Sequence, residues 1–465
     1  MNKYLLFLGL LLFVFISCSK KKDSTPAPVS AAITTTDPEA DPPQYGTPYS
    51  GVPATTDIIL YEINERAFSA TGNFAGITAR LDSIKALGAN VIWLMPINPI
   101  GVLKTVGSPY CVKDFRAVNS EYGTLEDLRT LINAAHNKNM AVILDWAANQ
   151  TSWDNAWITA HKNWYLQDGS GNIVWPPGTG FKDVAQLDYT NMDMRAEMIK
   201  DMKYWIHIAN FDGFRCDYAD HIPDSFWAQA IDTLTAIQPS RQLIFLAEGY
   251  NIGHLNAGFQ MVFGEGFYSA STGAFKTSSP GIPQNIYTAN TNEYNGVVAG
   301  KQRLRFTTTH DHSAFDGTPM TLFGGKQGSL AAAVATFYMA GVPLIYGSQE
   351  VGTTGLVSFF NNSTPIDWTA NPDMVVAYKK IIALRSTTPA LKTGSLTTYT
   401  DPDIVCFTRT LGPDTYLILV NLRNSTKTFT VPTALQATWT DAFDGSTVSL
   451  GATQGLTAYQ YIVLK

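Results

Sequence analysis

Four short apolar runs in this 465-residue chain end in polar side chains that can carry or bind charge. Each run is rich in Ile, Leu, Val, Phe or Thr, as buried strands are, and the polar residues stand at or just after its carboxyl end. In chain order they are Asp145 with Asn149, Arg215 with Asp217, Glu248, and His310 with Asp311. One such residue is most simply a cap or a solvated turn. Four strand ends in order predict a site assembled from several strands.

These residue types permit one chemistry in particular. Two carboxyl groups that flank a glycosidic bond can cleave it, one as an acid and one as a nucleophile. A third carboxylate can bind sugar hydroxyls, and an arginine can keep the nucleophile ionised. The spacing shows no Cys/His metal motif and no Ser-His-Asp order that would favour another mechanism.

The elements that must position these residues alternate between strand and helix patterns from residue 57 onward. Repeated β-α units with nearly continuous apolar strands favour a parallel sheet, and their number and the chain length fit an α/β fold of the (β/α)8 TIM-barrel type over residues 57–390. An open doubly wound sheet is the alternative, although no Gly-rich phosphate turn follows the first strand. The predicted strands are 58–63, 90–95, 140–145, 211–217, 243–248, 303–309 and 344–346. The predicted helices are 78–87, 125–137, 192–210, 225–237, 329–340 and 374–385.

Two further units are predicted around this barrel. Residues 150–188 interrupt the alternation after the third strand and contain four of the ten tryptophans, which indicates a small inserted domain B. Two interpretations of these tryptophans are possible: they form the core of the inserted domain, or they stack on sugars. After residue 390, short alternating strands at 404–410, 416–421, 427–431 and 459–464 predict a C-terminal antiparallel β-sandwich over residues 391–465.

The N-terminus resembles a bacterial lipoprotein signal. Lys3 precedes an apolar run at residues 4–16 that is too short to span a bilayer, and Ser17-Cys18 follows it. We expect a signal peptide at residues 1–17 and lipid attachment at Cys18; an ordinary secretory signal with an incidental cysteine is the alternative. The Pro-rich residues 18–56 are predicted to be a flexible tether, which would anchor the protein in a bacterial cell envelope, at the periplasm or the cell surface.

Composition narrows the choice of partners. The chain is 45% hydrophobic, which excludes disorder for its bulk, and its net charge of −6 makes nucleic acid an unexpected partner. The remaining cysteines, Cys111, Cys216 and Cys406, are widely spaced and are expected to be free buried thiols. We expect a monomer that contacts the membrane only through its lipid.

Taken together, the motifs resemble the α-amylase family of glycoside hydrolases over residues 57–465. The matching segments are 94–97, 145–149, 213–217, Glu248, 310–311, and 341–346 with Glu350. The resemblance implies that Asp217 is the nucleophile, Glu248 the general acid/base and Asp311 the residue that stabilises the distorted sugar. It also implies substrate contacts from Tyr110, which would stack on that sugar, and from Asp145, Gln150, Arg215 and His310.

Three positions depart from the family pattern. Gln150 stands where the family usually has a histidine that contacts the sugar, and the amide is neutral at every pH. Gln186 stands where many members have a calcium-binding aspartate, so a structural Ca²⁺ would rely on Asn149 and Asp183. Asp220 stands where amylases often have lysine, and it is either solvated or part of a substrate subsite.

We therefore expect a retaining glycoside hydrolase that acts on starch-like α-glucans or maltooligosaccharides by double displacement. A transglycosylase is the alternative within the same chemistry, since only the acceptor differs. A glycan-binding lipoprotein on an inactive scaffold is the alternative from another class, and Gln150 is the feature that favours it. Preference for α-1,4 or α-1,6 bonds and endo or exo action stay open.

Overall fold

A closed barrel of eight parallel strands forms the centre of the computed structural model, which describes residues 41–276, 281–361 and 363–465. The strand order around the barrel is β1-β10-β9-β8-β7-β6-β3-β2. This confirms the predicted TIM barrel and excludes the open sheet. The predicted signal peptide and lipid-attachment residue Cys18 lie outside the described residues.

Seven of the eight barrel strands overlap with predicted ones, although the predicted strand 303–309 shares only residues 303–305 with β9. The eighth, β8, was not predicted, because a strand of three residues is too short to show a periodic pattern. The bounds are β1 Leu60–Ile63, β2 Val91–Leu94, β3 Ala141–Trp146, β6 Gly213–Cys216, β7 Ile244–Ala247, β8 Met261–Phe263, β9 Gln302–Arg305 and β10 Val342–Tyr346.

Helices surround the barrel, and their ends follow local capping chemistry. The α4 helix begins with a capping box in which Thr124 and Asp127 bond each other's backbone, and α6 ends at Asn210 in the left-handed conformation. The predicted helix at 78–87 is instead two helices, because Arg80 leaves the helical conformation between them. The helices are α1 Glu65–Phe68, α2 Phe74–Thr78, α3 Leu81–Leu87, α4 Leu125–Asn137, α5 Trp157–Ala160, α6 Met192–Ala209, α7 Asp224–Ala236, α8 Gly253–Asn256, α9 Glu265–Phe275, α10 Pro283–Tyr294, α11 His310–Phe315, α12 Pro319–Leu322, α13 Gly325–Met339, α14 Pro372–Thr387 and α15 Pro389–Thr393.

The two-residue period of a strand separates the inside of the barrel from its outside. Leu60, Trp93 and Ile143 belong to the cluster that fills the lumen, whereas their neighbours in the chain pack in the larger cluster that includes the helices. The next inward position on β3 after Ile143 is Asp145. Gly213 admits no side chain on β6, because a Cβ there would lie 1.9 Å from the carbonyl oxygen of Ile244. On β3 the first inward-facing polar side chain therefore lies at the carboxyl end of the strand.

The segment between β3 and α6 forms a small lobe. Its β4 strand (Gln150–Ser152) pairs antiparallel with β5 (Val184–Gln186). Trp164 is buried and its ring packs edge-on against Trp157, whereas Trp175 is 42% exposed. Some of these tryptophans therefore serve as the core of the lobe, as one of the two interpretations predicted.

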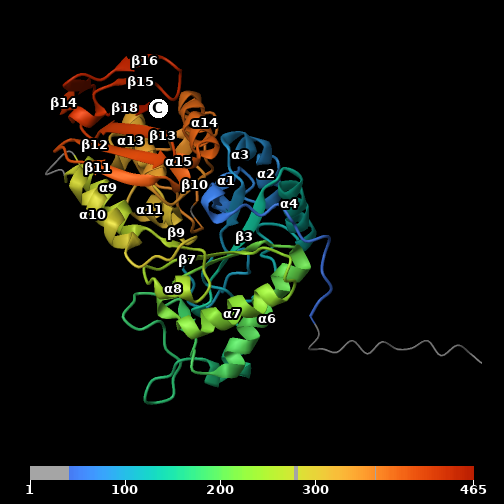
Figure 1. Ribbon diagram of the computed structural model, residues 1–465. Helices are drawn as coiled ribbons and strands as arrows, with labels where there is room; N and C mark the ends of the chain where they lie inside the picture. The colour runs from blue at the N-terminus through green and yellow to red at the C-terminus, as the bar shows by residue number, and fades with distance from the viewer. Residues whose placement is uncertain (1–40, 277–280, 362) are drawn as a thin grey trace, which may run out of the picture. The chain divides into compact units, whose positions relative to one another are not determined.

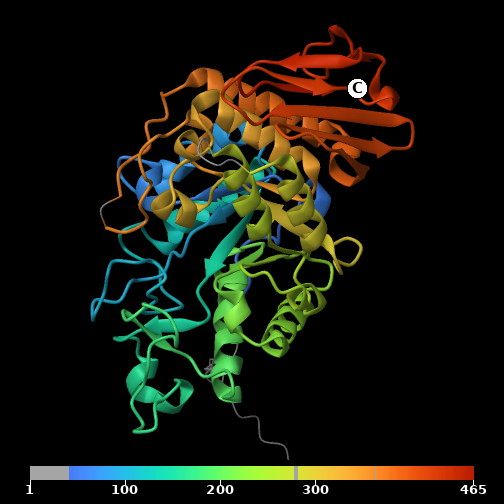
Figure 2. The same ribbon diagram turned by 90° about the vertical axis from the view of Figure 1, so that its left-hand side faces the viewer.

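The chain ends in antiparallel sheets that lie at the opposite end of the barrel from this lobe (Figures 1 and 2). A four-stranded sheet has the order β11-β12-β13-β18, and two further pairs are β14-β17 and β15-β16. The strands are β11 Ser395–Tyr399, β12 Ile404–Leu411, β13 Asp414–Asn421, β14 Lys427–Thr430, β15 Thr438–Thr440, β16 Thr447–Ser449, β17 Thr453–Leu456 and β18 Tyr461–Leu464. The short strands β11, β15, β16 and β17 were not predicted.

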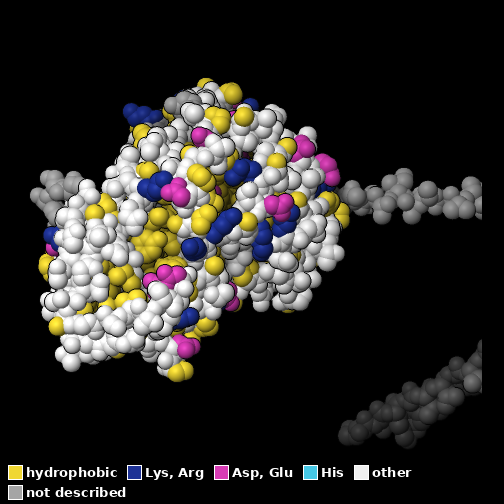
Figure 3. Space-filling model, turned by 90° about the horizontal axis from the view of Figure 1, so that it is seen from above, with side chains coloured by type: hydrophobic (Ala, Val, Ile, Leu, Met, Phe, Trp, Pro, Cys, Tyr) yellow, Lys and Arg dark blue, Asp and Glu magenta, His cyan; other side chains and the backbone are white. Residues whose placement is uncertain are grey.

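Within residues 41–276, 281–361 and 363–465, no helix combines the length and the apolar character needed to cross a bilayer. On the face shown in Figure 3, Lys and Arg side chains stand in small groups among Asp, Glu and hydrophobic side chains.

The predicted flexible tether requires a correction for residues 41–56, which contact the barrel. The Tyr45 backbone N–H donates to the carbonyl of His207 at 2.7 Å, and the Arg129 guanidinium lies over the Tyr45 ring. The Tyr49 ring stacks on His136 with centroids 4.4 Å apart. Two aromatic anchors thus dock a segment whose average composition is that of a linker.

Deleting residues 1–56 is therefore expected to lower the melting temperature, whereas deleting residues 1–40 is not. The longer deletion removes both tyrosines and exposes the surfaces of α4 and α6 that they cover. We expect a loss of about 2 kcal/mol, or roughly 3 °C or more for a unit of this size. Thermal unfolding of the two truncated proteins followed by circular dichroism measures this. Equal melting temperatures would show that residues 41–56 contribute nothing.

Candidate active site

A cavity of about 310 Å³ opens at the carboxyl end of the barrel. It brings together most of the side chains that the sequence analysis predicted, although they come from separate loops and strands. Those that line it are Tyr110, Gln150, Asp183, Asp217, Glu248, His310 and Asp311. Asp145 and Arg215 lie fully buried and contact these residues.

The Arg215 guanidinium connects three carboxylates. Its Nη1 donates to Asp145 Oδ1 at 2.8 Å and to Asp217 Oδ1 at 2.9 Å. Its Nη2 lies 2.8 Å from Glu248 Oε1, an ion pair whose angle does not make it a hydrogen bond. Because Arg215 and Asp217 are two residues apart, the pleat of β6 turns both toward the same side. One cation thus holds both predicted catalytic carboxyls beside one cavity.

Burial sets the charge state of this cluster. It raises the pKa of Asp217 well above its usual value, and the neighbouring Glu248 raises that pKa further, whereas Arg215 opposes the change. Burial also raises the pKa of Asp145, against the effect of Arg215. Burial alone would lower the pKa of Arg215, but the surrounding carboxylates raise it well above its usual value, so the guanidinium stays charged.

Glu248 is held at its second oxygen as well. Its Oε2 accepts a 2.7 Å hydrogen bond from the backbone N–H of Tyr218, the residue after Asp217. Tyr218 has a φ of 51°, a left-handed conformation that costs energy for a residue with a side chain. The strained turn therefore aims one N–H at the predicted acid/base directly after the predicted nucleophile.

A chain of hydrogen bonds joins Tyr110 and His310 to buried carboxylates. The Tyr110 hydroxyl donates to Asp145 Oδ2 at 2.9 Å and lies 2.8 Å from His310 Nε2. His310 Nδ1 lies 2.5 Å from Glu62 Oε1. Burial alone would lower the pKa of His310, but Asp311 and Glu62 raise it to about 9. The imidazole is therefore a cation at neutral pH and donates from both nitrogens.

Asp311 stands at the start of α11 with its carboxylate 43% exposed to solvent. One oxygen lies 3.5 Å from His310 Nε2. Because it lines the cavity and is partly open, this carboxylate can reach hydroxyl groups of a ligand.

The sequence analysis missed several residues of the site. Glu62 on β1 is fully buried, and its position inside an apolar run was a signal that went unused. The Trp93 indole donates to Asp145 Oδ2 at 3.0 Å, which no sequence pattern indicates. Aromatic side chains from several segments also line the cavity, namely Phe181, Tyr218, Phe315, Phe359 and Phe360.

Two other polar residues that the sequence analysis singled out have structural partners. Asp220 accepts hydrogen bonds from the backbone N–H groups of Tyr250 and Asn251, and it pairs with His254 at 2.8 Å. It thereby links the loops that follow β6 and β7 and is not simply solvated. Glu350 accepts a 2.6 Å hydrogen bond from the Tyr61 hydroxyl and does not line the cavity.

The residues proposed as calcium ligands do not form a suitable set. The Asn149 side-chain oxygen accepts a 3.0 Å hydrogen bond from Gln186, and Asp183 is not among the partners of Asn149. In the described part of the chain, no group of three or more His, Cys, Asp or Glu side chains could hold a metal ion. Ca²⁺ needs several oxygen ligands, usually with at least one anion, so this donor set does not fit it.

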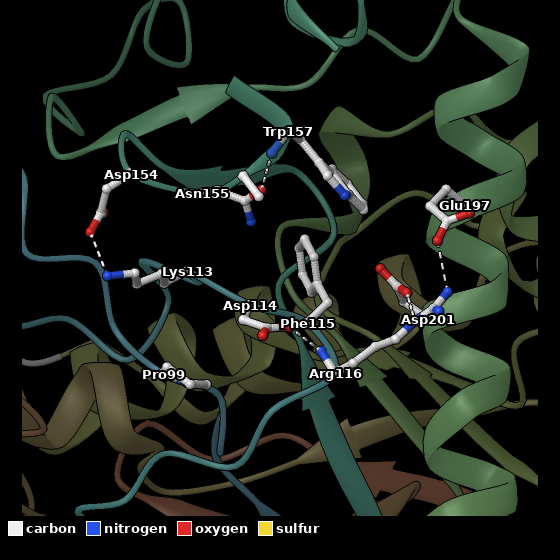
Figure 4. A pocket seen from close by; sticks show the side chains of 11 residues that line it. Pro99, Lys113, Asp114, Phe115, Arg116, Asp154, Asn155, Trp157, Glu197 and Asp201 are labelled. Atoms are coloured by element: carbon white, nitrogen blue, oxygen red, sulfur yellow. Dashed lines mark hydrogen bonds and ion pairs between the residues drawn. The ribbon is translucent and has the colours of Figure 1, made fainter. Parts of the chain in front are cut away.

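A larger cavity, of about 550 Å³, lies beside α6 and contains none of the predicted site residues. Figure 4 shows that its charged side chains pair with one another: Lys113 with Asp154, and Arg116 with Glu197 and Asp201. Both cations of this cavity are thus engaged in ion pairs, and none of the residues predicted to act in catalysis lines it, so the smaller cavity at the barrel end is the better candidate for chemistry.

The sequence and the structure were compared with known proteins, and the matches are to alpha-amylases and related enzymes. Residues 53–272 match the family model described as alpha amylase, catalytic domain. The chain is 26% identical over 346 residues to alpha-amylase 3 of Dictyoglomus thermophilum, covering 67% of each protein. It is 23% identical over 427 residues to the cyclomaltodextrin glucanotransferase of Paenibacillus macerans, covering 80% of this chain and 58% of that protein. An alpha-amylase from Lactobacillus plantarum has a similar structure, with a TM-score of 0.77 and 25% identity over 88% of this chain and 98% of that one.

The charged state of His310 can be tested without substrate. We expect its NMR resonances to titrate near pH 9, with assignment by His310→Asn. Because the folded pKa exceeds the unfolded value of about 6.5, the stabilisation that this cation provides is complete below pH 6.5 and disappears as pH rises through 9. Urea unfolding between pH 6 and 9.5 should show this loss in the unsubstituted protein and a flatter profile in His310→Asn. A resonance that titrates at or below pH 6.5 would contradict the assignment.

Proposed function

We propose that the chain is a member of the α-amylase family of glycoside hydrolases, as the match over residues 53–272 and the similar structure of an alpha-amylase indicate. We further propose that it is a retaining enzyme that cleaves α-glucosidic bonds in starch-like α-glucans or maltooligosaccharides. The observation that carries this proposal is the pair Asp217 and Glu248, which contact one guanidinium at 2.9 and 2.8 Å beside the same cavity. A retaining mechanism needs two carboxyl groups close to one glycosidic bond.

The first step uses the two carboxyls in different protonation states. Ionised Asp217 attacks the anomeric carbon while protonated Glu248 gives its proton to the leaving oxygen, so a glycosyl ester forms and the leaving sugar departs. Arg215 contacts both groups and favours the ionised form of Asp217. Tyr110 and Asp311 line the same cavity and are placed to contact the reacting sugar.

The second step decides between hydrolysis and transfer. Glu248, now ionised, takes a proton from the acceptor, which attacks the anomeric carbon and releases Asp217. Water as acceptor gives hydrolysis. A sugar acceptor gives transglycosylation, and the aromatic walls of the cavity favour this second candidate because they can stack on sugar faces. A non-catalytic binding role is less well supported, since the site has all three predicted carboxylates.

We also propose that Cys18 carries a lipid that anchors the enzyme in the bacterial cell envelope. The support is the Ser17-Cys18 sequence directly after the apolar run at residues 4–16. Radiolabelled fatty acid should enter the full-length protein in a bacterial host and should not enter a Cys18→Ala variant.

Residues 41–465 are expected to release reducing ends from starch or maltooligosaccharides with retention of anomeric configuration. Asp217→Ala should lower kcat by about four orders of magnitude because no nucleophile remains. Assays on starch, pullulan and maltooligosaccharides, with proton NMR of the first-formed anomer, measure both. Asp232→Ala, which changes an exposed carboxylate on α7, is the control and should keep full activity. Inversion, or no activity on any α-glucan, would refute the proposal.

The acid limit of activity should depend on Glu248 through its charge. Asp217 must be ionised to attack, so kcat/KM falls as pH falls through its raised pKa. In Glu248→Gln one negative neighbour is lost, and the pKa of Asp217 should fall, which moves the acid limb to lower pH.

α-Maltosyl fluoride is the suitable substrate, because fluoride leaves without a proton from Glu248. Glu126→Gln, at a solvent-exposed position on α4, should leave the limb in place. A limb that stays fixed or moves to higher pH in Glu248→Gln would contradict the charge coupling.

A further inference from the structure

We propose that three amide side chains, Gln186, Asn149 and Gln150, take the place of a bound cation at the base of the lobe and fix the direction in which Gln150 faces the substrate. The three residues are buried: Asn149 follows the end of β3, and Gln150 and Gln186 face each other in the β4–β5 pair. The structural half of this inference is independent of the reaction, whereas its catalytic half rests on the proposed function.

The orientation of Gln186 follows from its backbone partners. Its Nε2 lies 3.1 Å from the carbonyl oxygen of Asn149 and 3.0 Å from that of Leu187. Backbone carbonyls only accept hydrogen bonds, so the amide atom that faces them must be the nitrogen. The Oε1 atom of Gln186 is thereby turned toward Asn149.

Asn149 and Gln186 then pair reciprocally. Asn149 Nδ2 donates to Gln186 Oε1 at 3.0 Å, and Gln186 Nε2 donates to Asn149 Oδ1 at 3.0 Å. The second hydrogen of Asn149 Nδ2 goes to Gln150 Oε1 at 2.8 Å. Reversing the Asn149 amide would set donor against donor, so its orientation is determined by Gln186.

Gln150 is the last of the three hydrogen-bonded amides. Its oxygen is used by Asn149, so the group that it has left for a ligand is the NH₂ group, a pure donor. Gln150 also lines the cavity with Asp217 and Glu248. The backbone carbonyls at Asn149 and Leu187 thus set, through three amides, which atom of Gln150 a sugar hydroxyl meets.

The amides connect the segment after β3 to β5, which is the role that a bound cation would have at this place. A calcium ion would use the Asn149 oxygen as a ligand, but here that oxygen accepts from Gln186, and residue 186 carries no negative charge. Displacing Gln186 would leave a buried amide without partners, which is costly. The reciprocal pair instead joins the end of β3 to β5 with neutral groups, and β5 pairs with β4 next to the site.

The structural half predicts stability that is independent of metal. The melting temperature of residues 41–465 should be unchanged, within about 1 °C, between 5 mM EDTA and 5 mM CaCl₂. Gln186→Glu should melt at least about 3 °C lower in EDTA, because it loses the NH₂ group that faces three acceptor oxygens, and CaCl₂ should restore part of that loss.

Gln167→Glu is the matched control, because Gln167 is an exposed glutamine in the same lobe. It should respond to neither EDTA nor CaCl₂. An unsubstituted protein whose melting temperature falls in EDTA and recovers with CaCl₂ would overturn the proposal, as would a Gln186→Glu protein that is as stable as the original in EDTA.

The catalytic half is tested with a double-mutant cycle in EDTA. Asn149→Asp removes the donor to Gln150 Oε1 and sets two acceptors face to face, so kcat/KM on maltooligosaccharides should fall about tenfold. In the Gln150→Ala background the same substitution should cost less than twofold. A role in folding alone would give equal costs in both backgrounds and would refute the positioning role of Asn149.

Failure of the proposed function and failure of the positioning role of Asn149 give different results. If the unsubstituted protein hydrolyses no α-glucan, the proposed function is wrong, and the melting temperatures still decide the structural half. If it is active and the two Asn149→Asp costs are equal, the proposed function stands and the positioning role does not.

Discussion

The Arg215 guanidinium is fully buried and contacts three carboxylates, and the site depends on this one concentration of charge. A buried cation is costly unless it is paired, and buried carboxylates are costly without a cation. Asp145 stays fully buried because Trp93, Tyr110 and Arg215 all donate to it. Arg215 and the carboxylates therefore depend on one another, because each buried charge is stabilised by the opposite charges around it.

The barrel concentrates these charges because all its strands run in the same direction. Inward positions such as Leu60, Trp93 and Ile143 carry apolar side chains, whereas the polar residues Glu62, Asp145 and Arg215 stand near the carboxyl ends of their strands. Gly213 keeps β6 clear of the backbone of β7, so Arg215 can extend into this layer. The apolar lumen excludes water below the cluster, which strengthens its electrostatic interactions and raises the pKa of Asp217.

Two departures from the family pattern, Gln150 and Gln186, are structurally connected. Both residues contact Asn149, and the three amides satisfy one another with no net charge. A histidine at 150 and an aspartate at 186 would each have altered this pairing. The lobe is thus connected to the barrel by the same neutral residues that reach the cavity, so its anchoring and the shape of the site are linked.

From the residues alone, the barrel, the order of its long strands and the carboxylates at their ends could be predicted, because strand period and apolar runs are local properties of the chain. Glu62 left a local signal, a carboxylate inside an apolar run, although its partner His310 is far away in the chain. Trp93 and the aromatic walls could not be assigned, because their roles arise only from contacts between distant segments. The docking of residues 41–56 was missed because linker-like composition hides two anchoring tyrosines. The charge of His310 and the orientation of Gln150 likewise depend on burial and on which atoms meet across strands, which only the tertiary structure decides.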